Sequence, residues 1–229
     1  MRVIRAIIAV LLVCCAALPA AATSGFGWNT TVTLSPQGGH MLGNPDAPIK
    51  VTEYVSYSCH FCAEFANQSE GPLRIGYISS GKVSFEVRNL LLNSFDLPLA
   101  MLVECGPKER FFLNHIAFYR RQQRWLDKLQ DLTKAQTVRW GSGTMAQRNR
   151  AIASDLQLYD IMESLGFDRM QVDKCLTDEA AAARIKAQSD AALDLGVSGT
   201  PSFAINGSLM EDIHDWPALR RVIDLSNET

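Results

Sequence analysis

The chain has 229 residues, of which 47% are hydrophobic and 20% are charged, and its formal net charge is −2. This composition is typical of a globular protein and excludes the disordered, collagenous and coiled-coil classes. No run of lysine or arginine occurs, so nucleic acids and anionic membrane surfaces are poor candidates as partners.

Residues 1–22 are typical of a secretory signal peptide. Arg2 and Arg5 supply a positively charged start, residues 7–17 form an uncharged apolar run, and three consecutive alanines ending at Ala22 offer a cleavage site. The strongly apolar part is shorter than the roughly 18 to 20 residues that a membrane anchor needs. We therefore expect export with cleavage near Ala22, which leaves 207 residues and takes the net charge to −4.

Four cysteines remain after cleavage, and an even number in an exported chain suggests two disulfides. They are Cys59, Cys62, Cys105 and Cys175, which allow three pairings. Cys59 and Cys62 are close enough in sequence to pair at the start of a helix, in which case Cys105 either pairs with Cys175 or stays free. We expect that second disulfide, whose loop of about 70 residues corresponds to at most about 4 kcal/mol of stability in the chain-entropy model.

The first predicted strand covers residues 49–55 (IKVTEYV), where Ile49, Val51 and Val55 alternate onto one face. Glu53 is the remaining residue on that face. A carboxylate on a buried strand face is costly unless it has a partner or a role. The pattern leaves two interpretations open: Glu53 is buried and functional, or the register is shifted and its side chain is solvated.

A helix is predicted to begin at Cys59, directly after this strand. Ser58 is a good N-cap residue, and apolar residues follow at helical spacing until Pro72, which should kink the helix. Residues 83–88 (VSFEVR) alternate again and predict a second strand. The order strand, helix, strand indicates an α/β unit with a parallel strand pair.

Between about residue 95 and residue 195 the pattern has only helical periods, interrupted by prolines and glycines. The predicted helices cover residues 97–105, 109–129, 146–166, 168–176 and 177–196. A short hairpin around Asn206-Gly207 follows, and a last amphipathic helix covers 216–224. A block of helices is thus placed between strands.

The motif that carries chemistry is Cys59-His60-Phe61-Cys62, after a strand and at a helix N-terminus. A thiolate at Cys59 would face unpaired helix N–H groups and the positive end of the helix dipole. His60 would help when protonated, and Cys62, one turn deeper, is suited to be the resolving thiol. We interpret the pair as redox-active. An inert disulfide is an alternative, and so is a zinc site, for which the chain offers no second pair of ligands at matching spacing.

Other candidate residues are predicted to be structural. His115 lies on an apolar helix face and is expected in the core or in a groove, whereas His40 and His214 have turn residues beside them and are expected to be solvated. Trp125 and Trp140 are expected in the core of the helical block.

The segment VTEYVSYSCHFCAEF resembles the active-site strand and helix of DsbA-type thiol:disulfide oxidoreductases in the thioredoxin superfamily, and SGTPSFAING near the C-terminus extends the resemblance. The resemblance implies that Pro201, preceded by Thr200, has a cis peptide bond and lies against the Cys-x-x-Cys motif. It also implies that Glu53 is the family's buried acid, six residues before the first active cysteine, which favours the functional interpretation.

The fold implied by the resemblance is α/β, a thioredoxin fold with a helical insertion between its third and fourth strands. The expected divisions are a signal peptide at 1–22, thioredoxin-like parts at 23–94 and 177–229, and a helical insertion at 95–176. Nothing resembles the separate dimerisation domain of the isomerase members, so a monomer in the periplasm is expected. No metal or other cofactor is expected.

The implied activity is donation of the Cys59–Cys62 disulfide to reduced exported proteins through a mixed disulfide at Cys59. A quinone-linked membrane oxidase would restore the disulfide. The strong oxidant of this family has Pro-His between its cysteines, whereas this chain has His60-Phe61, and a threonine before the cis proline also occurs in isomerase members. A reductase or isomerase that uses the same site stays an alternative, as does a non-catalytic client-binding or metal-carrying module.

Overall fold

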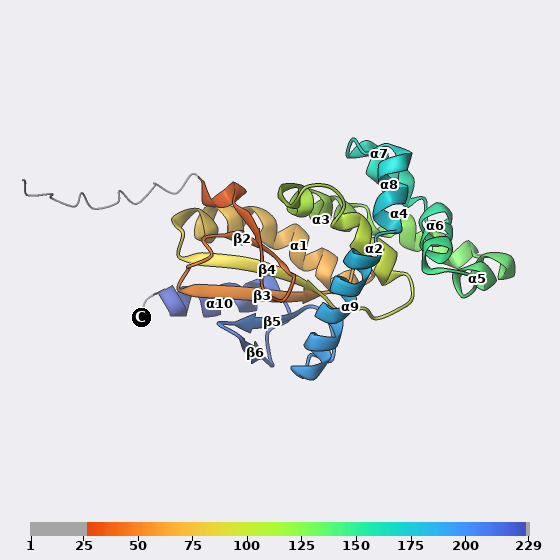
Figure 1. Ribbon diagram of the computed structural model, residues 1–229. Helices are drawn as coiled ribbons and strands as arrows, with labels where there is room; N and C mark the ends of the chain where they lie inside the picture. Colours follow the sequence, from red (N-terminus) through yellow and green to blue (C-terminus); the bar gives the residue numbers. More distant parts are fainter. Residues whose placement is uncertain (1–26, 228–229) are drawn as a thin grey trace, which may run out of the picture.

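The computed structural model describes residues 27–227. Their strands form one six-stranded sheet in the order β1-β2-β4-β3-β5-β6, with helices on both of its faces (Figure 1). The expected signal peptide lies outside the described residues. Within residues 27–227, no helix combines the length and the apolar character needed to cross a membrane.

The sheet contains one parallel strand pair, β3 with β4, and its other neighbouring strands are antiparallel. The strands are β1 (Val32–Leu34), β2 (His40–Gly43), β3 (Ile49–Val55), β4 (Val83–Asn89), β5 (Ser202–Ile205) and β6 (Ser208–Met210). The predicted parallel pair and the C-terminal hairpin are confirmed. β1 and β2 were not predicted, because strands of three and four residues are too short to show an alternating pattern.

The helices are α1 (His60–Pro72), α2 (Asp96–Val103), α3 (Phe111–Arg120), α4 (Gln122–Leu126), α5 (Lys134–Trp140), α6 (Met145–Asp155), α7 (Leu158–Ser164), α8 (Arg169–Leu176), α9 (Glu179–Asp194) and α10 (Trp216–Asn227). Two predicted helices are each divided into two. The first breaks at Arg121, and the second breaks at Gln157, whose φ of 57° is left-handed. Helix α5 was not predicted; Thr133 and Gln136 form a capping box at its start.

Helix α1 begins one residue later than predicted. Cys59, not Ser58, is its N-cap, with extended backbone angles of φ −78° and ψ 122°. The Ser58 hydroxyl is already engaged, because it accepts a hydrogen bond from Asn93 at 2.7 Å. After Pro72 the chain continues as a short π-helical segment, Leu73–Tyr77, so the regular helix does end at the proline.

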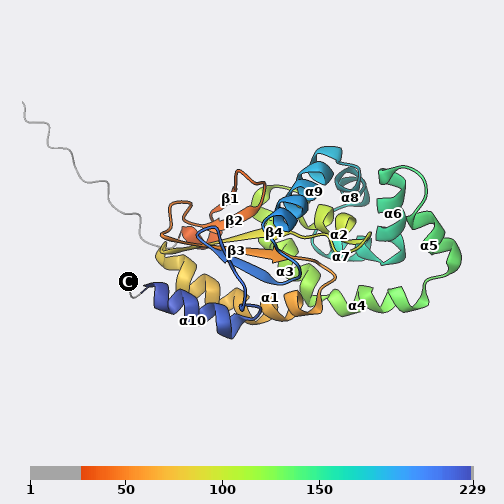
Figure 2. The same cartoon turned by 90° about the horizontal axis from the view of Figure 1, so that it is seen from below.

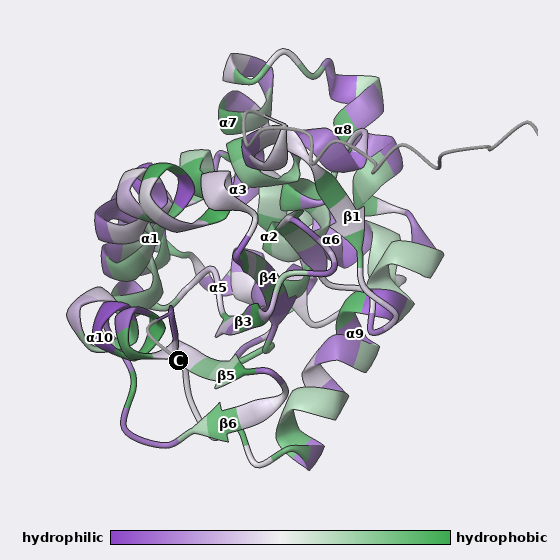
Figure 3. Cartoon of the chain, turned by 90° about the vertical axis from the view of Figure 1, so that its left-hand side faces the viewer, coloured by the Kyte–Doolittle hydropathy of each residue, from purple (hydrophilic) through white to green (hydrophobic). Residues whose placement is uncertain are grey.

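The sheet lies between two helical layers. Figure 3 shows α1 and α10 on one side of it and α9 on the other. Val51 and Val55 of β3 point into the larger core on the α1 side, whereas Tyr54 belongs to a smaller apolar cluster that it shares with Ala192 of α9. The alternation predicted for β3 is therefore confirmed.

Helices α2 to α8 lie between β4 and β5 in the chain, and α4 to α6 extend beyond the end of the sheet (Figure 2). If β2 is counted as the first strand of the thioredoxin fold, β4 is the third and β5 is the fourth. The predicted helical insertion between the third and fourth strands is thus confirmed, while its boundaries at 95 and 176 stay predictions.

The prediction that His40 is solvated is wrong. His40 is only 4% exposed because it lies on β2, and its ring stacks on Phe111 with ring centroids 3.9 Å apart. Burial, and secondarily the charge of Arg184, lowers the pKa of His40 to about 3, so its imidazole is neutral at physiological pH. His115 is buried as predicted.

A disulfide joins Cys105, which follows α2, to Cys175 in α8. The two cysteines are 70 residues apart in sequence, so the bridge connects the beginning of the helical insertion to its end. Cross-linking a long loop lowers the conformational entropy of the unfolded chain.

We predict that replacing Cys105 and Cys175 together by alanine lowers the free energy of unfolding by about 2 to 4 kcal/mol. The measurement is urea denaturation of the parent and the double variant without reductant. Equal unfolding midpoints, or alkylation of Cys105 in the native unreduced parent, would contradict this prediction.

Candidate active site

The candidate active site lies where β3 ends and α1 begins. The chain reverses there in a turn over residues 56–59, closed by a hydrogen bond from the Cys59 amide to the Ser56 carbonyl at 3.1 Å. The reversal makes Cys59 the N-cap of α1, so its side chain lies at the end of the helix where the N–H groups are unpaired.

The two motif cysteines differ in exposure. Both are free thiols in this structure; Cys59 is half-buried, and Cys62 is 0% exposed. The Cys59 thiol donates a hydrogen bond to the Thr200 carbonyl at 3.1 Å. Only Cys59 is therefore open to an approaching thiol, with Cys62 one helical turn behind it.

Several hydrogen bonds favour the thiolate form of Cys59. They lower its pKa from 9.0 to about 6. The largest contribution is the hydrogen bond with the Cys62 side chain, which outweighs the opposing effect of burial; the Thr200 side chain and the backbone amides of Cys62 and Phe61 add to it. The Thr200 hydroxyl has no other partner among the described residues, so it is free to donate to the thiolate.

The Cys62 thiol, in contrast, favours its protonated form. Burial is the main cause that raises the pKa of Cys62 well above its usual range, and its hydrogen bond to Cys59 adds to that effect. The difference between the two thiols gives them different roles: at neutral pH the exposed sulfur is the thiolate, and the buried sulfur holds the proton.

Glu53 is 0% exposed, which shows that the solvated interpretation of this residue is wrong. Neither of its carboxylate oxygens has a hydrogen-bond partner among the described residues. Burial, followed by the nearby Cys59 thiolate, raises the pKa of Glu53 well above its usual range. These surroundings thus favour the protonated form of Glu53.

Glu53 borders a small hollow of about 30 Å³ between the sheet, α1 and α3. His115 also lines this hollow, and so do Glu70 of α1 and Arg74 of the following π-helical segment, which form an ion pair with a 3.0 Å contact. By this measure one water molecule needs roughly 10 to 15 Å³, so the hollow has room for one or two water molecules beside Glu53.

The Thr200-Pro201 segment lies beside the cysteine pair, directly before β5. Its peptide bond is cis. A groove runs past it, lined by Phe61 and Phe65 of α1 on one side and by Pro201 and His214 on the other. Phe61 is 64% exposed at the edge of this groove, and His60 is also exposed, packing edge-on against the Phe61 ring.

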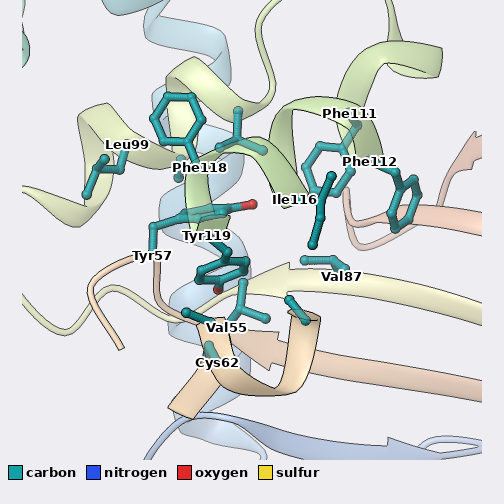
Figure 4. Close-up of a cluster of buried hydrophobic side chains, with 14 of the residues drawn as sticks. Val55, Tyr57, Cys62, Val87, Leu99, Phe111, Phe112, Ile116, Phe118 and Tyr119 are labelled. Atoms are coloured by element: carbon teal, nitrogen blue, oxygen red, sulfur yellow. The ribbon is translucent and has the colours of Figure 1, made fainter. Parts of the chain in front are cut away.

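Aromatic side chains lie beneath the turn. Tyr57 and Tyr119 stack with ring centroids 5.1 Å apart, above Val55 and close to Cys62 (Figure 4). The Tyr119 hydroxyl donates to the Ser56 carbonyl at 3.1 Å. Sequence patterns did not indicate a role for Tyr119, because its nearness to the motif results from the packing of α3 on α1.

The predicted site residues therefore fall into two groups. Those that the structure brings together at the turn are Cys59, Cys62, His60, Phe61, Glu53, Thr200 and Pro201. Cys105 and Cys175 form a separate disulfide in the helical insertion. Among the described residues, no group of three or more histidine, cysteine, aspartate or glutamate side chains is placed to hold a metal ion.

Comparison with known proteins adds independent observations. A family model described as Thioredoxin matches residues 35–225. A putative protein-disulfide oxidoreductase of Rickettsia bellii is 26% identical over 174 residues, which cover 75% of this chain and 58% of that protein. A probable disulfide bond formation protein D of Bacillus anthracis is 28% identical over 188 residues, covering 80% of this chain and 76% of the relative. The chain thus spans little more than half the length of the Rickettsia protein.

Solved structures agree with this relationship. A protein-disulfide isomerase from Novosphingobium aromaticivorans is 45% identical, with a TM-score of 0.79, over 82% of this chain and 97% of that protein. The alpha-DsbA1 protein of Wolbachia pipientis shares the fold with a TM-score of 0.64 at 23% identity, over 83% of this chain and 92% of that protein. The chain belongs to the thioredoxin family.

Proposed function

We propose that this protein is an extracytoplasmic oxidoreductase that donates its Cys59–Cys62 disulfide to reduced exported proteins. The observation that carries the proposal is the contrast between the two sulfurs: Cys59 is accessible and stabilised as a thiolate, whereas Cys62 is buried and holds its proton. A good leaving group at the accessible sulfur favours the reduced form of the enzyme and so drives oxidation of the client.

In the first step a client thiolate attacks the Cys59 sulfur. The Cys59–Cys62 bond breaks, a mixed disulfide forms between the client and Cys59, and the electron pair leaves on Cys62. Glu53, whose protonated form is favoured by burial, would deliver a proton to that sulfur, directly or through a water molecule. A water molecule in the hollow beside Glu53 would return the proton to this carboxyl.

In the second step another client thiolate attacks the client sulfur of the mixed disulfide. Cys59 leaves as a thiolate, received by the amides at the start of α1 and by the Thr200 hydroxyl. The client has then lost two electrons and gained a disulfide, and the enzyme is the dithiol. By the family resemblance, a quinone-linked membrane oxidase would remove the two electrons, and the location would be the periplasm.

The groove beside Thr200 and Pro201 supports docking of an extended client segment. Its exposed Phe61 ring offers apolar contact area, and Pro201 has no N–H group that would have to be paired when the groove is empty. A client cysteine in this groove would lie next to the half-buried Cys59 sulfur.

One observation favours isomerase activity as a second candidate function. The Novosphingobium relative, 45% identical to this chain, is described as a protein-disulfide isomerase. Isomerisation uses the same first attack but starts from the Cys59 thiolate of the reduced enzyme, which opens a wrong client disulfide. The two activities therefore differ in whether the enzyme is kept as the Cys59–Cys62 disulfide, for oxidation, or as the dithiol, for isomerisation.

We predict that Cys59→Ser lowers oxidation of a reduced client to the uncatalysed rate, because the attacked sulfur is gone. Cys62→Ser should instead trap a mixed disulfide with a client that contains a disulfide, because the Cys59 thiolate opens the client disulfide, releasing one client thiolate, and no resolving thiol remains. Refolding assays and non-reducing mass spectrometry measure both effects. A Cys59→Ala variant with full activity would favour the non-catalytic client-binding module.

We predict that the ultraviolet absorbance of the thiolate in the reduced protein titrates with a midpoint near the Cys59 pKa of about 6. Because that pKa is below the unfolded value of 9.0, the folded dithiol protein binds fewer protons than the unfolded chain between these two pKa values. Its stability should rise with pH over that range, and this contribution should be lost as the pH falls through the folded pKa. A midpoint near that of a free cysteine would contradict the assignment.

We predict that Glu53→Gln slows disulfide exchange at neutral pH by about tenfold or more, because the group that exchanges a proton with Cys62 is removed. The raised pKa of Glu53 means that the fold loses stability as pH rises through it, so the variant should become more stable than the parent at high pH. Glu163→Gln, at an exposed position of α7, is the matched control. Equal rates of disulfide exchange for the parent and Glu53→Gln would contradict a role of Glu53 in proton transfer.

A further inference from the structure

The turn that presents Cys59 is held by a side chain from the helical insertion. Gln122, the first residue of α4, is buried, and its amide nitrogen donates to the carbonyls of Tyr57 and Cys59, each at 2.8 Å. One amide group thus bridges both ends of the peptide segment that leads into the reactive cysteine, across more than 60 positions of sequence.

Two further helices of the insertion contact the same turn. The Tyr119 hydroxyl, from α3, donates to the Ser56 carbonyl. The buried carboxylate of Asp96, from α2, accepts hydrogen bonds from the Ser58 amide at 3.1 Å and from the Ser56 hydroxyl at 2.8 Å. The insertion therefore supplies donors and an acceptor to consecutive backbone groups of residues 56–59.

Gln122 matters because of which carbonyls it contacts. The Cys59 carbonyl also accepts the first hydrogen bond of α1, from Ala63 at 3.3 Å. Fixing this carbonyl fixes the orientation of the N-cap residue, and with it the direction of the Cys59 side chain relative to the amides of α1. Without Gln122, the carbonyl of the buried Tyr57 would lose a donor, so the present conformation of the turn would be less favourable.

The chemical type of the side chain also fits this task. A neutral amide donates to carbonyls without placing a charge beside a thiolate. A lysine or arginine at this position would attract the Cys59 thiolate directly, and a glutamate would repel both carbonyls and the thiolate.

We propose that Gln122 is a positioning residue for disulfide exchange, whose amide, with support from the Tyr119 hydroxyl, holds residues 56–59 in the conformation that directs the Cys59 sulfur toward the amides of α1. This inference rests on the proposed function, since it takes Cys59 as the sulfur that exchanges. It gives the helical insertion a part in tuning the reactive sulfur, in addition to any contact with clients.

The test compares three variants of the full chain. Gln122→Met keeps the length of the side chain and removes its donor, and Tyr119→Phe removes one hydroxyl with little change of shape. Gln123→Met is the matched control, because Gln123 is exposed and its side-chain amide donates at 2.6 Å to Asp127, the residue after α4. Thermal unfolding establishes that each variant is folded.

We expect Gln122→Met to raise the midpoint of the Cys59 thiolate titration and to shift the equilibrium with glutathione by about fivefold toward the disulfide form of the enzyme, as expected for one lost hydrogen bond. Tyr119→Phe should shift both quantities in the same direction by less. Gln123→Met should match the parent in both.

Folded Gln122→Met and Tyr119→Phe variants with the parental titration midpoint and glutathione equilibrium would overturn the proposal, even if their melting temperatures fell, because only stability would then depend on these contacts. If Gln122→Met does not fold, an unshifted Tyr119→Phe overturns it. A parent that fails to oxidise clients, together with a shifted Gln122→Met titration, would instead refute the proposed function and leave the positioning role standing.

Discussion

The chain reversal at residues 56–59 is the constraint on which the site depends. It ends a central strand and makes Cys59 the N-cap of α1, so that one sulfur meets the unpaired amides of the helix while the other, at Cys62, lies buried a turn deeper. A thiolate is stable at the first position and unfavourable at the second. Under the proposed function, this difference within a single helical turn favours donation of the disulfide to a client.

Three separate parts of the chain bring side chains to this turn and its two cysteines. β3 carries Glu53 behind the cysteine pair, and the segment before β5 brings Thr200 to the Cys59 sulfur. The insertion between β4 and β5 supplies Gln122 to the backbone of the turn. Acid, hydroxyl and amide thus come from positions far apart in sequence, and the sheet order with β3 between β4 and β5 makes their convergence possible.

Sequence patterns predicted the strands, helices and turns that are determined by neighbouring residues in the sequence. The alternation of residues 49–55, the helix after them and the Asn206-Gly207 turn follow from neighbouring residues, and the resemblance to a known family placed Glu53 and Pro201 near the cysteines. The short strand that buries His40 could not be predicted, because it is stabilised by pairing with β4 and by stacking on Phe111. The contacts of Gln122 with the turn likewise depend on how α4 packs, which no spacing in the sequence encodes.

The central claim is that the surroundings of Cys59 stabilise the reduced enzyme enough to make it an oxidant of clients. The reduction potential of the Cys59–Cys62 pair, measured by equilibration with glutathione, tests this claim most directly. We predict a value clearly less negative than the potential of thioredoxin, which is about −270 mV. A value equal to or more negative than that would contradict disulfide donation and indicate a reductase.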